Sequence, residues 1–183
     1  MEKDWANDFY EILPTLSKRN DLVEISEELI KTENIPGKAL EGVGRLEKFR
    51  DIMIDLIYQR ISLQQAYLDV EKKLGYIGSP YAYNNRIFPT GWGERLVRTQ
   101  LSRFYNQAIL TQILNQGQEK CFIPHSNSED SFSKCSLSLA GKEHNSKALL
   151  DAIVDIYSNG NFQNKSPRVP DHPHCTHVVR PID

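Results

Sequence analysis

The sequence lacks a strong net charge, a long apolar run and the start of a signal peptide. Its 183 residues include 22 basic and 24 acidic side chains, which gives a formal net charge of −2. This balance excludes a strongly basic nucleic-acid-binding protein. No apolar run approaches the roughly 18 residues of a membrane-spanning helix, and the opening Met1-Glu2-Lys3-Asp4 does not begin a signal peptide. We therefore expect a protein that is made and kept in a cytoplasm, without a membrane partner.

Cysteine is also scarce. The three cysteines, Cys121, Cys135 and Cys175, form no Cys-x-x-Cys pair and no zinc-finger spacing. An odd number without a secretion signal favours free thiols or metal ligands over a disulfide framework. The sequence has no internal repeat, and its length allows one domain or two small ones with a sizeable core.

What the sequence does contain is a cluster of three histidines and one cysteine within six residues near its C-terminus. Imidazole and thiolate together are the ligand set of a tetrahedral zinc site. In an extended segment, His172 and His174 would share one face. Cys175 and His177 would share the other, so only a subset binds one metal unless Pro173 helps to make a turn. The alternative is a solvated His-rich tail that binds metal weakly.

Helical periodicity dominates the first two-thirds of the chain. Two of the expected helices begin with capping patterns, Asp21 with Glu24 and Ser62 with Gln65. Residues 75–90, rich in Gly, Pro, Tyr and Asn, read as a loop or an arm. The helices are expected within residues 5–16, 21–33, 45–60, 63–74 and 93–115.

After Gly117 the periodicity gives way to short mixed segments. Strands are expected at residues 121–124, 137–139 and 178–179, and a short amphipathic helix at residues 146–157. The sequence thus predicts a mainly α fold with a small C-terminal α+β unit, in which a long central helix is joined by short strands that a Cys/His metal site can staple. We expect two regions, a helical one in residues 1–90 and a second in residues 91–183.

Three motifs in residues 94–183 follow the order and spacing of a known family. Residues 94–108 are similar to a helix pattern, R-x-x-R-T-E followed by A-Y-N, with Gln100 in place of the acidic residue and Phe104 in place of the alanine. Residues 135–142 run from a cysteine into L-x-G-K. Residues 170–181 are similar to P-x-x-H-P-x-C-R-C-x-x-x-P, with one residue fewer after the first proline and with Thr176 and His177 in place of R-C. Together they resemble the phage Mu F-type head-morphogenesis family, the minor head proteins of tailed phages. The resemblance marks residues 91–183 as a domain of that type.

The resemblance implies a closed structural zinc site made by Cys135, His172, Cys175 and His177. His177 stands where the family has its final cysteine, and imidazole can replace thiolate on zinc. A second cysteine that many members carry before the position of Cys135 is absent. The alternative is that Cys135 and Cys175 are packed as small hydrophobic side chains. The reserve ligands are Cys121, His125, His144 and His174.

The motifs also single out residues other than metal ligands. Arginines on a helix surface are commonly solvated, but Arg98 and Thr99 can instead hydrogen-bond the C-terminal β region and lock the helix to the metal segment. A phosphate contact with packaged DNA is a third option, which the acidic net charge disfavours. The candidate structural or binding residues are Arg95, Arg98, Thr99, Asn106, Gly141, Lys142 and Pro173.

The resemblance implies a non-enzymatic minor head protein that acts in capsid assembly at the portal or inner capsid, in the virion or the host cytoplasm. Its partners would be portal or other capsid proteins, and packaged DNA. A candidate docking strip is formed by Tyr76, Tyr81, Tyr83 and Phe88, unless these rings fold back onto the protein's own helices.

One alternative function is a metal-dependent nuclease or toxin domain that uses the His/Cys cluster, which needs an open metal position and a general base. Another is a zinc-stabilised nucleic-acid-binding module, which needs a basic stripe.

Overall fold

The computed structural model describes residues 4–182, and within them the chain is mainly helical with one small sheet. This confirms the fold class expected from the sequence. Among the described residues, no helix has both the length and the apolar composition needed to cross a membrane. In chain order the elements are the 3-10 helix η1 (Phe9–Glu11), α1 (Ile12–Leu16), α2 (Asn20–Thr32), the 3-10 helix η2 (Lys38–Leu40), α3 (Arg45–Ile57), α4 (Leu63–Leu74), α5 (Trp92–Asn115), β1 (Lys120–Ile123), α6 (Lys134–Leu139), β2 (Lys142–Asn145), α7 (Ser146–Tyr157) and β3 (Arg180–Pro181).

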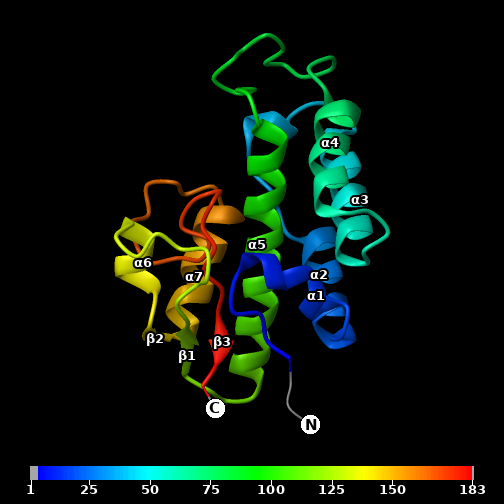
Figure 1. The fold of residues 1–183 in the computed structure, drawn as a ribbon. Helices are drawn as coiled ribbons and strands as arrows, with labels where there is room; N and C mark the ends of the chain where they lie inside the picture. Colours follow the sequence, from blue (N-terminus) through cyan, green and yellow to red (C-terminus); the bar gives the residue numbers. More distant parts are fainter. Residues whose placement is uncertain (1–3, 183) are drawn as a thin grey trace.

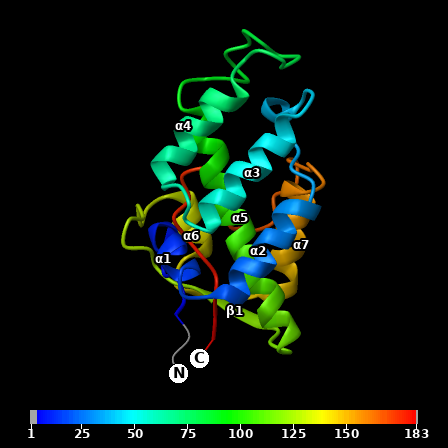
Figure 2. The same ribbon diagram turned by 90° about the vertical axis from the view of Figure 1, so that its right-hand side faces the viewer.

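Helix α5 lies at the centre of the fold. It has α2, α3 and α4 on one side and the sheet, α6 and α7 on the other (Figure 1). Seen from the side of α3, the N-terminal helices lie in front of α5 (Figure 2). Because α5 has neighbours on both sides, 16 of its 24 residues are buried. The buried apolar side chains form one cluster that includes residues before and after position 90. The division into two regions at that position stays a prediction.

The capping pattern at Ser62 is confirmed, and the one at Asp21 is wrong. The Ser62 hydroxyl accepts a hydrogen bond of 3.1 Å from the Gln65 amide, and helix α4 begins there. Helix α2 instead begins at Asn20, so Asp21 lies in its first turn. The Asp21 carboxylate accepts hydrogen bonds from the buried guanidinium of Arg19. The Asp21 carboxylate therefore pairs with the buried Arg19 guanidinium and does not cap the helix.

The sheet has the order β2-β1-β3, and β1 pairs antiparallel with both neighbours. Its central strand confirms the expectation for residues 121–124. The last strand lies at Arg180–Pro181, not at residues 178–179. Val178 and Val179 are fully buried just before it, and the Val179 amide donates to the side chain of Asn106 on α5 at 2.7 Å. That amide is therefore bonded to a helix, not to a strand.

The strand expected at residues 137–139 is wrong, because this segment is part of helix α6. Ser133 caps the helix by accepting a hydrogen bond of 3.2 Å from the Ser136 amide. Leu139 is buried and Leu137 is 62% exposed, so the two leucines do not share one face as they would in a strand. A turn at Gly141, with φ of +68°, then leads into β2.

The connection between α4 and α5 extends beyond the helices at one end of the molecule (Figure 1). Phe88 folds back, is buried, and stacks edge-on against Trp92. The Tyr81 hydroxyl donates a 2.8 Å hydrogen bond to Glu41. Tyr83 is 90% exposed and Tyr76 is half exposed. The aromatic rings of this connection are thus divided between the protein's own core and its surface.

Candidate metal centre

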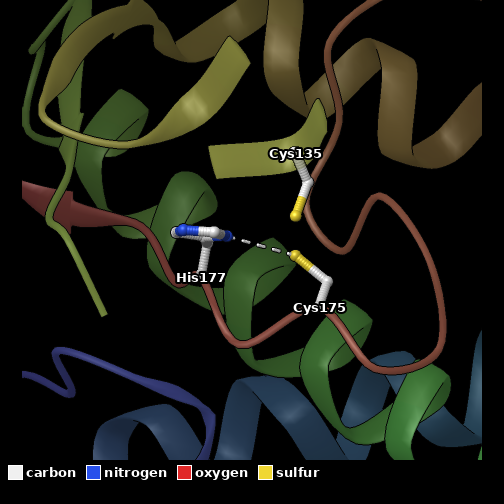
Figure 3. A group of neighbouring side chains, drawn as sticks. All are labelled: Cys135, Cys175 and His177. Carbon is white, nitrogen blue, oxygen red and sulfur yellow. Dashed lines mark hydrogen bonds between the residues drawn. The ribbon is translucent and has the colours of Figure 1, made fainter. Parts of the chain in front are cut away.

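Three of the expected metal ligands meet beside helix α6. Cys135 lies in the first turn of α6, and Cys175 and His177 lie on the closing segment, which we define as residues 170–181. The two sulfur atoms and the ring of His177 point toward one another (Figure 3). One ligand atom from each residue lies within 4.8 Å of the other two, and all three residues are buried. This group can hold a metal ion.

Local hydrogen bonds place the two halves of the group. The Ser133 hydroxyl that caps α6 also lies 3.4 Å from the sulfur of Cys135. In the closing segment the Cys175 amide donates to the carbonyl of His172 at 3.0 Å, which makes the turn expected around Pro173. The Phe9 amide donates to the carbonyl of Thr176 at 2.9 Å. Residues near both ends of the chain therefore fix the segment that carries Cys175.

His172, the expected fourth ligand, lies at the edge of the group. Its Nε2 is 3.3 Å from the sulfur of Cys135. It is not among the three residues whose ligand atoms all lie within 4.8 Å of one another, and its side chain is exposed. His172 and His174 line a cavity of about 210 Å³ that opens in front of Cys135. The fourth position stays a prediction.

A hydrogen bond between the two thiols of the group shifts their pKa values in opposite directions. The pKa of Cys135 is lowered to about 4, first because the Cys175 thiol donates a hydrogen bond to it and further because of Ser133 and His172. The pKa of Cys175 is raised by the same hydrogen bond and by burial. Thiolate is the form of cysteine that binds metal, so the lowered pKa of Cys135 suits this residue to a ligand role.

His177 presents one ring nitrogen to the sulfurs and the other to a carboxylate. Its Nδ1 lies 3.6 Å from the sulfur of Cys175. Its Nε2 lies 2.5 Å from Oε2 of Glu129 and 3.3 Å from the Ser136 hydroxyl. Burial acts to raise the pKa of Glu129, but the hydrogen bonds from His177 and His125 lower it below its usual value. Glu129 could not be singled out from the sequence, because the acidic pair Glu129-Asp130 in a polar loop gives no signal of a site.

The reserve ligands have other partners. Cys121 is buried in β1, where burial raises the pKa of its thiol to about 11. His125 Nδ1 lies 2.5 Å from Oε1 of Glu129. His144 Nε2 lies 2.9 Å from the Leu139 carbonyl. In the described part of the chain, the group that can hold a metal is thus Cys135, Cys175 and His177.

Arg98 connects helix α5 to the closing segment. Its Nε donates to the Pro173 carbonyl at 3.2 Å, and its Nη1 donates to the Tyr10 hydroxyl at 3.1 Å. The guanidinium also lies over the ring of Phe9, 4.2 Å from its centre, and Arg98 is buried. Of the three roles open to Arg98, the structure shows the contact with the closing segment. Thr99 contributes only a bond within the helix, from its hydroxyl to the Arg95 carbonyl.

The remaining motif residues also make contacts within the protein. Asn106 donates to the Ser102 carbonyl at 2.7 Å and accepts from the closing segment through Val179. Arg95 donates to the Thr90 carbonyl at 2.9 Å. The Gly141 amide donates to the Ile123 carbonyl at 2.8 Å, and Lys142 donates to the carbonyl of Leu137 at 2.5 Å.

In comparisons with known proteins, no family model, no curated protein and no solved structure matches this chain.

Proposed function

We propose that this protein is a non-enzymatic phage minor head protein that acts in capsid assembly and contains a structural zinc ion. The observation that carries the proposal is the convergence of the three motif segments on one buried site. Cys135 of the second motif meets Cys175 of the third, and Arg98 of the first donates to Pro173 beside them. Each of the three motifs therefore supplies at least one residue that joins these segments of the fold.

Burial favours a structural role over a catalytic one. Cys175 and His177 are each 1% exposed, and the second ring nitrogen of His177 is occupied by Glu129. The sheet beside the site is short, and a small β region with little core gains stability from a metal that binds only the folded state. A zinc ion here would hold α6 to the closing segment.

The observed separations suit tetrahedral zinc. Zinc–sulfur bonds of about 2.3 Å and zinc–nitrogen bonds of about 2.0–2.1 Å place a sulfur and a nitrogen ligand about 3.6 Å apart in a tetrahedron. Cys175 Sγ and His177 Nδ1 are 3.6 Å apart, and Cys135 Sγ and His172 Nε2 are 3.3 Å apart. A modest rotation of the exposed His172 ring would complete a closed Cys₂His₂ set.

The partners we propose are portal or other capsid proteins. At one end of the molecule, Val43, Ile77 and Tyr83 are at least 90% exposed. The loop that carries Val43 lies against the loop that carries Ile77. The two backbones are so close that a Cβ added at Gly42 would lie 2.5 Å from the Gly78 carbonyl oxygen. Exposed apolar and aromatic side chains on adjoining loops are candidate anchors for a protein partner. We name Val43, Ile77 and Tyr83 the apical patch.

A phage lysate tests this proposal. The protein should be found in mature particles or in assembly intermediates, and its absence from both would contradict the proposal. An Ile77→Ala/Tyr83→Ala double variant should incorporate less well, because it removes two anchors of the apical patch. Phe162→Ala is the matched control, since Phe162 is exposed but lies after α7. Normal incorporation of the double variant would remove the apical patch as the docking surface and leave the head-protein proposal in place.

The cavity in front of Cys135 supports a second candidate, a metal-dependent nuclease or toxin domain. Three protein ligands with an open fourth position are the composition of catalytic zinc sites. The cavity of about 210 Å³ has room for a water molecule at that position. Metal-dependent cleavage of DNA or RNA that is lost in His172→Ala or His174→Ala would establish the enzyme. Under the leading proposal the purified protein cleaves neither.

A further inference from the structure

Glu129 is a buried carboxylate with two histidine partners, and only one of them belongs to the candidate metal centre. Its side chain is 8% exposed. Oε2 lies 2.5 Å from Nε2 of the buried His177, and Oε1 lies 2.5 Å from Nδ1 of His125, whose side chain is 68% exposed. The same carboxylate thus makes one contact inside the protein and one at its surface.

The contact with His177 fixes which ring nitrogen carries a proton. An ionised carboxylate can only accept hydrogen bonds, so the proton of the neutral imidazole lies on Nε2, where it is donated to Glu129. The lone pair then lies on Nδ1, the nitrogen that is 3.6 Å from the sulfur of Cys175. This is the tautomer that can bind a metal shared with the two cysteines.

Residues 8–9, which contact the closing segment beside His177, also contact the loop that carries Glu129. The neighbouring Ser128 hydroxyl donates to the Asp8 carboxylate at 3.2 Å. Phe9, which follows Asp8 in the sequence, donates its amide to the carbonyl of Thr176, beside His177. The loop that carries Glu129 and the closing segment that carries His177 are therefore both anchored on residues 8–9, which keeps the carboxylate beside the ring.

We propose that Glu129 is a positioning residue for the metal centre, which holds His177 in the orientation and tautomer that bind the ion. This inference rests on the structural metal site proposed above. A carboxylate that accepts from the far nitrogen of a metal-bound histidine orients the ring and makes it a better ligand, and its loss commonly weakens metal binding about 10- to 100-fold. Since Glu129 lies on the far side of the ring from the sulfurs, it acts through His177 and not as a ligand itself.

Zinc titration of the full chain against a chromophoric chelator tests the proposal. Glu129→Ala should raise the zinc dissociation constant about 10- to 100-fold. Glu129→Gln should raise it less, because the amide oxygen still accepts from Nε2. His125→Ala is the matched control: it removes the surface contact of the same carboxylate, and its dissociation constant should equal that of the wild type.

Nitrogen NMR of the His177 ring provides a readout that a loss of stability alone would not change. In the metal-free wild type the ring should carry its proton on Nε2, and Glu129→Ala should give a mixture of tautomers. A wild-type ring protonated on Nδ1, an unchanged zinc dissociation constant in Glu129→Ala, or an equal loss in His125→Ala would each overturn the inference. Wild-type protein that binds zinc while Glu129→Ala binds it equally well leaves the proposed function intact. Wild-type protein that binds no zinc contradicts both.

Discussion

At the scale of single residues, the three cysteines differ in what surrounds them although all are buried free thiols. Cys135 and Cys175 lie beside one another and beside His177, whereas Cys121 lies in β1 with its sulfur 3.5 Å from the His144 carbonyl. Burial alone therefore does not identify a cysteine as a metal ligand. Cys135 and Cys175 are identified as candidate ligands because each lies near the other's sulfur and near the ring of His177.

Replacing either clustered cysteine should abolish tight metal binding. We expect Cys135→Ser and Cys175→Ser each to lose stoichiometric zinc, because each removes one of the two thiolates of the site. Cys121→Ser should keep its zinc even though it too changes a buried thiol. Elemental analysis of the three purified variants measures this, and loss of zinc from Cys121→Ser would show that the core, not the ligand set, controls retention.

Arg98 supports the site by a different route, through packing and hydrogen bonds. Arg98→Ala should lower the free energy of unfolding by about 2 kcal/mol or more, because it leaves the Pro173 carbonyl without its charged donor and removes packing on Phe9. Arg95→Ala is the control, since its bond to the Thr90 carbonyl is exposed, and we expect less than about 0.5 kcal/mol. Urea denaturation measures both, and equal losses would contradict the account of Arg98.

At the scale of elements, the long periodic helices could be predicted from the sequence and the short segments around the site could not. The pattern in α5 extends over 24 residues, which leaves little ambiguity. In α6 the two leucines at 137 and 139 fit a strand as well as a helix, and the cap at Ser133 decides for the helix. Cys135, Cys175 and His177 could be chosen by residue type, but the place of Glu129 depends on contacts between distant segments.

The turn at Gly141 joins α6 to β2 and gives a test at this scale. Gly141 and Gly117 both have positive φ, of +68° and +76°, so alanine at either should cost about 1 kcal/mol of strain. A Cβ at Gly141 would also lie 2.5 Å from Nε2 of His125, whereas one at Gly117 would meet nothing within 4 Å. The exposed His125 ring can turn away from this Cβ but then loses its contact with Glu129, so thermal unfolding should show a modestly greater loss for Gly141→Ala than for Gly117→Ala. The reverse order would contradict the packing described for this turn.

At the scale of the whole molecule, α5 is shared by two sets of neighbours, and α6, which carries Cys135 of the candidate metal centre, lies on one side of it (Figure 1). Metal removal should therefore have an unequal effect. With chelator, amide hydrogen exchange should speed up in α6 and the closing segment, while α2, α3 and α4 stay protected, because these three helices lie on the other side of α5 from the site. Uniform loss of protection along the chain would show that the metal supports the whole fold.

We propose that Cys135, Cys175 and His177 hold a structural zinc ion, and the metal content of the untagged full chain tests this without any substitution. Elemental analysis should find about one zinc per chain, and a chelator should lower the melting temperature, because an ion bound only to the folded state adds its binding free energy to stability. Zinc no higher than background, together with a melting temperature that chelator leaves unchanged, would contradict the claim and leave the two cysteines as packed side chains of the core.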